Sequence, residues 1–208
     1  MSSLACQAPI FSVKFFIMQA VVNQDFLSVE DYLAGEEAGE IKHEYIAGTV
    51  YAMAGGTSDH HQIGLNIAFA ARSHLKGKPC KVFVFDFKLR LKISEGDVFY
   101  YPDVMVGCDP RDTHTLYLRF PKLLVEISSE STERLDRCEK KLAYQTIETI
   151  EEYLIVAQDR YEVILYRRDN DWQPELFSRL SDSVTLKAIE LDLPLFSIYE
   201  GLALGAVA

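Results

Sequence analysis

Two carboxylates in this sequence lie where water is expected to be scarce. Glu126 interrupts the apolar run of residues 123–128, which is typical of a strand buried on both faces. Asp103 lies in a second apolar run, residues 98–106, directly after Pro102, which predicts an interruption or bulge that re-aims its side chain. An isolated charge removed from water costs several kcal/mol unless it is paired or bound to a metal. If the two strands are neighbours, the carboxylates converge.

Converging carboxylates of this kind suit a divalent metal ion. Mg²⁺ and Mn²⁺ prefer carboxylate and carbonyl oxygens together with waters, so we expect Asp103, Glu126 and the main chain of Ile127 to supply ligands. Such a site would hold a phosphate oxygen and acidify a water, which is the chemistry of phosphodiester hydrolysis. Asp86, in the apolar run of residues 82–91, either joins this group or marks the exposed end of a strand.

A lysine is spaced to reach the same site. Lys140 follows Asp136 by four residues and precedes Tyr144 by four, so the three side chains share one face of a helix. Its ammonium would stabilise the negative charge that develops on the phosphate. A purely structural interpretation of each residue stays open. Lys140 could be only a surface partner of Asp136. Glu126 could be a structural carboxylate paired with a buried cation, and Asp103 could be part of a turn.

Taken in order, these residues and an amino-terminal set resemble the bacterial putative restriction endonuclease family of the PD-(D/E)XK nuclease superfamily. The matching pieces span roughly residues 25–157, and their order is far more specific than any one of them. They are His43-Glu44-Tyr45-Ile46-x-Gly48, Met53-Ala54-Gly55 with His60, Tyr101-Pro102-Asp103, Val125-Glu126-Ile127-Ser128, and Asp136-x-x-x-Lys140-x-x-x-Tyr144.

The resemblance implies a role for most of these side chains. The superfamily pattern places a lysine two residues after the glutamate, where this chain has Ser128, and in the resembled family the following helix supplies it, which points to Lys140. Glu44 resembles the additional acidic residue of the family. His60, near a helix amino terminus, is a candidate for binding a substrate phosphate, although a plain first-turn histidine is the simpler interpretation.

The function implied is that of a metal-dependent endonuclease that hydrolyses DNA with Mg²⁺ or Mn²⁺. A second hypothesis, motivated by Ser128, is a catalytically silent nucleic-acid-binding or oligomerising module with the same fold. A third is an RNA- or nucleotide-directed phosphohydrolase, which would share the metal site. A homodimer is expected by analogy, because two strands are cut. The aromatic residues of the run 82–91 are expected in the core before they serve as platforms for stacked bases.

Composition predicts the number of domains and the compartment, and the net charge argues against strong binding of nucleic acid. A chain of 208 residues, 49% apolar, predicts one domain over residues 25–208, after a poorly ordered extension over residues 1–24. The cysteines lack metal-binding spacing and are expected to be reduced thiols of a cytoplasmic protein without a membrane span. A net charge of −10 disfavours coating of nucleic acid. A basic rim would offset this charge, with six candidates: Lys76, Lys78, Lys81, Lys88, Arg90 and Lys92.

The elements that must position these residues follow from hydrophobic periodicity and turn signals. They predict an α/β (α+β) fold with a restriction-endonuclease-like core, in which helices flank a central mixed β-sheet and an N-terminal helix and β-hairpin precede it. The expected helices cover residues 28–39, 60–75 and 131–149. The expected strands cover residues 42–46, 49–53, 82–91, 98–106, 123–128, 153–157 and 161–166.

Overall fold

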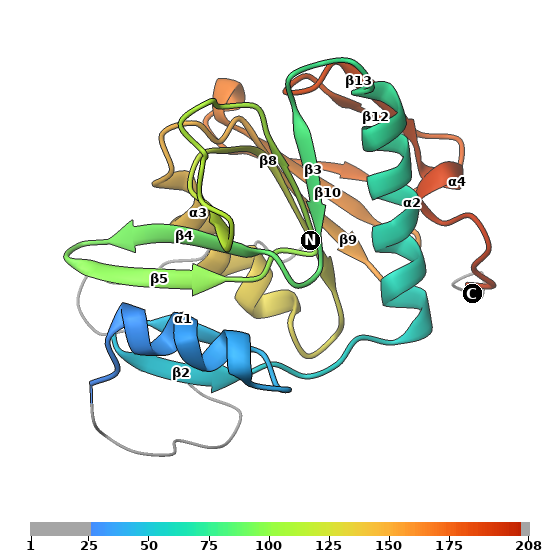
Figure 1. The fold of residues 1–208 in the computed structure, drawn as a ribbon. Coiled ribbons are helices and arrows are strands. Elements are labelled where there is room, and N and C mark those ends of the chain that lie inside the picture. The colour runs from blue at the N-terminus through green and yellow to red at the C-terminus, as the bar shows by residue number, and fades with distance from the viewer. Residues whose placement is uncertain (1–25, 205–208) are drawn as a thin grey trace.

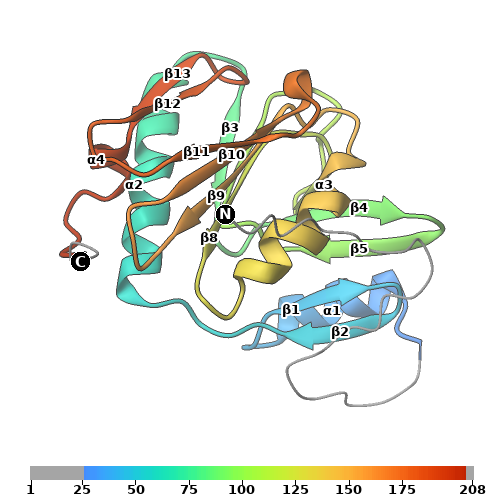
Figure 2. The same ribbon diagram turned by 180° about the vertical axis from the view of Figure 1, so that it is seen from behind.

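The computed structural model describes residues 26–204, so the expected extension over residues 1–24 lies outside the described residues. Its fold is α+β, as predicted, and most of its strands belong to one of two main sheets (Figures 1 and 2). The division into an extension and one domain stays a prediction. No helix among residues 26–204 is both long and apolar enough to cross a membrane.

The N-terminal helix and hairpin form as predicted. Helix α1 (Val29–Ala38) begins after Ser28, whose hydroxyl accepts a hydrogen bond from the main-chain N–H of Asp31. Strands β1 (His43–Ile46) and β2 (Thr49–Ala52) pair antiparallel around a two-residue turn. Both turn residues, Ala47 and Gly48, have positive φ, which is the geometry that such tight hairpins require.

The central sheet has six strands in the order β11-β10-β9-β8-β6-β3. Its strands β8 and β9 run parallel, and the other neighbours run antiparallel, so the sheet is mixed as predicted. The bounds are Lys81–Val84 for β3, Val104–Gly107 for β6, Pro121–Ser128 for β8, Glu152–Ala157 for β9, Val163–Arg167 for β10 and Pro174–Phe177 for β11.

A five-stranded sheet in the order β2-β1-β5-β4-β7 lies beside it. Its further strands are β4 (Lys88–Ile93), β5 (Gly96–Tyr100) and the short β7 (Tyr117–Leu118). Near the C-terminal end, β12 (Ser183–Leu186) and β13 (Leu191–Pro194) form a separate two-stranded sheet, followed by the one-turn helix α4 (Leu195–Ile198). A 3₁₀ turn, η2 (Arg168–Asn170), links β10 to β11.

The chain passes between the two main sheets at two matching breaks. The prediction of one strand over residues 82–91 is wrong, because the chain turns at Phe85, which has a positive φ of 55°, and separates β3 from β4. The interruption predicted at Pro102 is confirmed, since it separates β5 from β6. Each of the two predicted strands is therefore divided between the two sheets, and Asp103 lies where the second one is divided.

The central sheet carries a helix on each face. Helix α2 (Ser58–His74) lies along β3, β6 and β8 (Figure 1), where Ile63 and Ile67 are buried in one core with Val104 and Val125. Thr57 caps this helix, since its hydroxyl oxygen accepts a hydrogen bond from the main-chain N–H of His60. On the other face, Tyr144 joins Met105, Leu124 and Tyr153 in a second core.

The second covering helix differs from the one expected over residues 131–149. Helical residues extend from Glu133 to Gln145. Within them, η1 (Leu135–Lys140) is a π-helix that continues directly into the α-helix α3 (Lys141–Gln145). Short π-helical segments of this kind are frequent at functional sites because they re-aim side chains relative to an α-helix. Lys140, the last residue of η1, is such a side chain.

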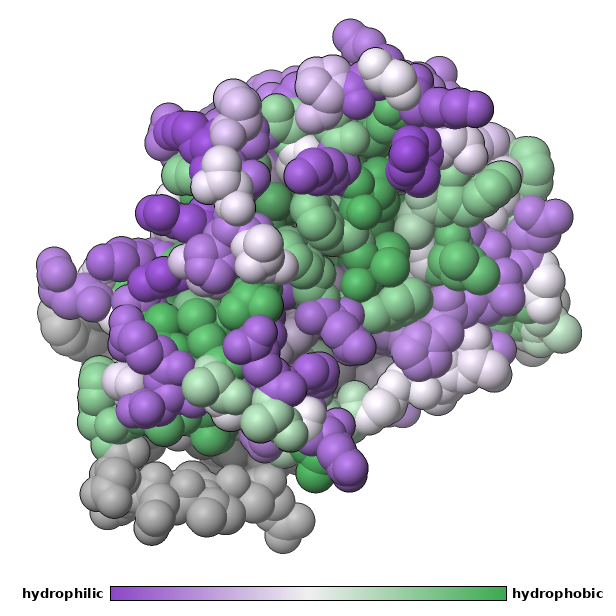
Figure 3. Space-filling model, in the orientation of Figure 1, coloured by the Kyte–Doolittle hydropathy of each residue, from purple (hydrophilic) through white to green (hydrophobic). Residues whose placement is uncertain are grey.

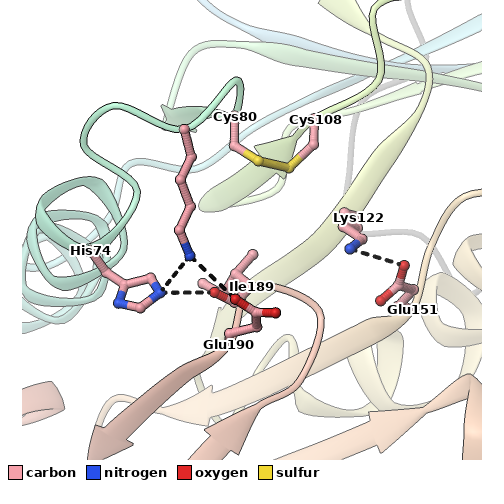
Figure 4. The surroundings of a disulfide bond; sticks show 8 residues. His74, Cys80, Cys108, Lys122, Glu151, Ile189 and Glu190 are labelled. Carbon is pink, nitrogen blue, oxygen red and sulfur yellow. Dashed lines mark hydrogen bonds and ion pairs between the residues drawn. A yellow bond between two sulfur atoms is a disulfide. The ribbon is translucent and has the colours of Figure 1, made fainter.

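The expectation of reduced cysteines is wrong for Cys80 and Cys108, which form a disulfide with their Cα atoms 4.1 Å apart (Figure 4). The antiparallel register of β3 and β6 pairs Lys81 with Gly107. Cys80, which precedes Lys81, therefore faces Cys108, which follows Gly107. The 28-residue separation conceals this proximity in the sequence. Cys138 is not free either, and Cys6 lies outside the described residues.

Candidate active site

Asp103 and Glu126 face each other across the two strands at the centre of the main sheet. The antiparallel register of β6 and β8 pairs Val104 with Val125, so one residue further it places Asp103 opposite Glu126. Residues that face each other in an antiparallel pair project from the same face of the sheet. The main-chain N–H of Ile127 donates to Oδ2 of Asp103 at 2.7 Å, which holds the aspartate against β8.

Glu126 is the more deeply buried of the two carboxylates, with only 5% of its side chain exposed. Its Oε1 atom accepts hydrogen bonds from Nζ of Lys140 at 3.1 Å and from the hydroxyl of Tyr144 at 2.6 Å. Both hydrogen bonds that the described residues donate to this side chain end on Oε1, so Oε2 is left for another ligand. Burial raises the pKa of Glu126 well above its usual range, and the attraction of Lys140 does not cancel the effect.

Lys140 is surrounded by carboxylates. Its Nζ atom lies 3.2 Å from Oε1 of Glu44 and 3.8 Å from Oδ1 of Asp136, in addition to its contact with Glu126. Burial alone would lower the pKa of the ammonium, but the neighbouring negative charges outweigh it, and the pKa is raised well above the usual lysine value. Lys140 therefore stays protonated near neutral pH and serves as a fixed positive charge, not as a base.

Asp136 belongs to this cluster although the sequence indicated it only as a helix-face neighbour of Lys140. Its side chain is nearly fully buried, and burial raises its pKa to about 6. The four-residue spacing to Lys140 was the only signal in the sequence. Because this spacing usually means an ordinary pair on a helix surface, it did not indicate a buried role for Asp136. The π-helix directs both side chains inward.

His60 reaches the cluster from the opposite covering helix. Its Nε2 atom lies 2.7 Å from Oδ1 of Asp103, and Thr57 caps the helix at its main-chain N–H. Burial lowers the pKa of His60, but the hydrogen bond and the charge of Asp103 raise it by more, so the net shift is upward. The imidazole thus contacts the aspartate, and its expected phosphate contact stays a prediction.

Asp86 and the expected basic residues make no contact with this cluster that the described residues show. Asp86 is exposed in the bend between β3 and β4, and no hydrogen bond or ion pair within residues 26–204 connects it to the four carboxylates. The six basic residues do not form one rim: Lys88 is buried over the ring of Tyr101, and Arg90 is paired with Asp97. Lys88 and Arg90 therefore add no free positive charge to the expected basic rim, and a rim formed by the other four residues stays a prediction.

The donor set fits a hydrated divalent cation. Four carboxylates, those of Glu44, Asp103, Glu126 and Asp136, meet one ammonium and one imidazole, which leaves a surplus of negative charge even when His60 is protonated. Among the described residues, no three carboxylate, imidazole or thiolate side chains are grouped closely enough to enclose an ion alone. A divalent cation here would therefore need waters among its ligands, as Mg²⁺ usually has.

Comparison with known proteins gives a family match over most of the chain. Residues 29–195 match the model of a protein family described as "Putative restriction endonuclease". Two uncharacterized proteins of Synechocystis sp. are similar along most of their length. One is 38% identical over 85% of this chain and 93% of its own, and the other is 31% identical over 75% and 89%.

A solved structure shares the fold. The crystal structure of a putative nuclease from Anabaena variabilis superposes with a TM-score of 0.63 and covers 76% of this chain and 89% of that one. The two sequences are 18% identical, so the likeness shows the fold alone. The restriction-endonuclease-like architecture expected from the sequence is thereby confirmed.

Proposed function

Because the chain belongs to the family described as putative restriction endonucleases, we propose that it is a metal-dependent endonuclease that hydrolyses DNA phosphodiester bonds. The observation that carries the proposal is the opposed pair of Asp103 and Glu126 on central strands, with the ammonium of Lys140 against Glu126. Neither carboxylate is explained by stability alone, since buried charges are costly where apolar residues would pack well.

Each residue would have a separate task. Asp103, the free Oε2 of Glu126 and the main-chain carbonyl of Ile127 would hold Mg²⁺ or Mn²⁺. When bound, such an ion supplies an acidified water and polarises a phosphate oxygen. Lys140 would donate to the phosphate as negative charge develops on it.

The remaining polar side chains would position these groups. Glu44 and Asp136 hold the ammonium of Lys140 between them. Tyr144 orients Glu126 from the following helix, and His60 orients Asp103 from α2. Supporting contacts of this kind keep ligands in the geometry that a metal needs.

Plasmid cleavage tests the proposal. We expect wild-type protein to nick or linearise plasmid DNA with Mg²⁺ or Mn²⁺ and to be inactive with EDTA. Asp103→Asn and Glu126→Gln keep the shape of the side chains but remove their charge, and each should lower the cleavage rate at least about 100-fold. Asp171→Asn is the matched control, because Asp171 is exposed at the end of η2, beyond β10. Equal cleavage by wild type and Asp103→Asn would overturn the proposal.

A catalytically silent module is the second candidate, and Ser128, which is buried where the superfamily pattern has lysine, favours it. Calorimetric titration with Mn²⁺ separates the two. The nuclease requires binding of Mn²⁺ that Glu126→Gln abolishes, whereas a silent module need not bind the ion. An RNA- or nucleotide-directed hydrolase would bind Mn²⁺ equally, so RNA and nucleotides are tested as substrates beside the plasmid.

The cytoplasmic location and the homodimer stay part of this proposal. Sedimentation of the purified protein tests the dimer. Because disulfides are rare where glutathione keeps thiols reduced, the redox state of Cys80 and Cys108 in fresh cell extract tests the cytoplasmic location, and a formed disulfide there would contradict it.

A further inference from the structure

A cavity of about 660 Å³ lies beside the central sheet, away from the carboxylates. It is bordered by β3, by residue Phe87 beyond the strand break, and by the loop of residues 108–115. The Cys80–Cys108 disulfide attaches this loop to the start of β3 (Figure 4). Cys108 itself lines the cavity. The wall of the cavity is thus held by a covalent link.

The cavity opens on the same face of the sheet as the candidate active site. Phe83, which lines it, is paired with Met105 and packs in the same core as Leu124. Leu124 and Glu126 are two residues apart on β8, and residues at this spacing project to one side of a strand. The cavity and Glu126 therefore share a face, which is opposite the one that α2 covers.

Two aromatic rings form a flat wall of this cavity. The rings of Phe83 and Phe87 are stacked with their centroids 4.3 Å apart and an angle of 10° between their planes. Both side chains are only partly buried, so part of the stack is accessible from the cavity. Figure 3, drawn in the orientation of Figure 1, shows hydrophobic residues over β3 with hydrophilic residues around them. A planar apolar ligand would extend the stack.

The two carboxylates around the cavity have partners within the chain. Two acidic residues line it, but Asp109 is paired with Arg111 at 2.7 Å, and Asp112 accepts hydrogen bonds from the main-chain N–H groups of residues 119 and 120. Lys81, also in the lining, is exposed. A phosphate group beside the aromatic wall would therefore meet a cation, while the nearby carboxylates are already engaged.

The distance to the candidate active site suits a nucleic-acid strand. Gly107 lines the cavity at one end of β6, and Asp103 precedes the other end. Four residues of extended strand span about 13 Å. Met105 and Leu124, which lie between the two places, are fully buried, so a DNA strand would pass around the surface. At about 3.4 Å per stacked nucleotide, it would need more than four nucleotides to join them.

From these observations we propose that the cavity binds an unpaired base of the DNA strand whose phosphodiester lies at Asp103 and Glu126. The inference rests on the proposed function and narrows its substrate to single-stranded or locally unpaired DNA. Stacking of bases on aromatic side chains is the common basis of single-strand binding without sequence preference. It gives the acidic chain a source of affinity that needs few basic residues.

Binding measured by fluorescence anisotropy tests the inference. The probes are a labelled short oligothymidine and a blunt duplex of the same length, with Ca²⁺ in place of Mg²⁺ to prevent cleavage. Phe83→Leu and Phe87→Leu remove a ring but keep an apolar side chain. Each is expected to weaken binding of the oligothymidine about ten-fold or more and to leave duplex binding unchanged. Phe87→Tyr should restore binding, and Phe69→Leu, at an exposed position on α2, is the matched control.

Equal affinity of wild type and both leucine variants for the oligothymidine would overturn the inference, as would equal losses for both probes. A second measurement does not depend on the variants: an oligonucleotide that contains 2-aminopurine should lose fluorescence on binding to wild-type protein, because the base stacks on a ring. Unchanged fluorescence of the bound oligonucleotide would also contradict it. Neither experiment requires cleavage, so failure of the proposed nuclease activity is detected separately with plasmid.

Discussion

Lys140 lies 3.1 Å from Glu126 although the two side chains come from different elements, the π-helix η1 and the strand β8. A lysine at position 128 would have reached the site from the same strand as the glutamate. Here that position is a buried serine, and a helix that packs on the sheet supplies the charge instead. The consequences of this arrangement are testable.

Removal of the ammonium should destabilise the metal-free protein. Lys140→Ala leaves two buried carboxylates, those of Glu126 and Asp136, without their cation, and we expect a loss of about 3 kcal/mol in the free energy of unfolding. Urea denaturation in EDTA measures it. Lys141→Ala is the matched control, because Lys141 lies over the ring of Tyr166 outside the cluster. Similar stability of both variants would contradict the assigned burial of Lys140.

The hydroxyl of Tyr144 is expected to act through Glu126. Tyr144→Phe removes the 2.6 Å hydrogen bond to Oε1 and should weaken Mn²⁺ binding about 10-fold or more, as is usual for residues that support a metal ligand. Tyr153→Phe is the comparison, because its hydroxyl donates to the main chain of Asp136 and not to a carboxylate. Calorimetric titration of both variants with Mn²⁺ decides the matter, and equal affinities would assign Tyr144 a purely structural role.

Asp136 should make the metal-free protein less stable as the pH rises. Its pKa is about 6 in the folded protein, against 3.8 for an ordinary aspartate, so the folded state binds more protons than the unfolded state between these values. The contribution of Asp136 to stability is therefore largest below pH 4 and declines up to about pH 6. Urea unfolding in EDTA at several pH values, compared with Asp136→Asn, isolates this slope. A difference between the two proteins that grows in favour of wild type with rising pH would contradict the shift.

Reduction of the disulfide should lower stability. A bond that closes a 28-residue separation is expected to contribute about 3–4 kcal/mol, chiefly by restricting the unfolded chain. The double variant Cys80→Ala/Cys108→Ala should lose this amount relative to wild type in urea denaturation without reductant. Added dithiothreitol should then change wild type more than the variant. Equal effects on both would show that the bond does not form.

Local sequence determined much of the fold and part of the site. The serine cap of α1, the Ala47-Gly48 hairpin and the buried strand around Glu126 follow from turn chemistry and hydrophobic periodicity, which act over a few residues. The same periodicity singled out Asp103 and Glu126, because a charge between apolar neighbours is conspicuous in any strand.

Only the tertiary structure decided how these pieces meet. Residues 82–91 have the pattern of one strand, but Phe85 adopts a backbone conformation that a pattern does not encode, and the two halves join different sheets. The register that opposes Asp103 to Glu126, and Cys80 to Cys108, depends on strand pairing over 20 or more residues. The inward direction of Asp136 depends on packing of a π-helix against that sheet. Such long-range contacts arise from the burial of whole faces, which no short segment of sequence specifies.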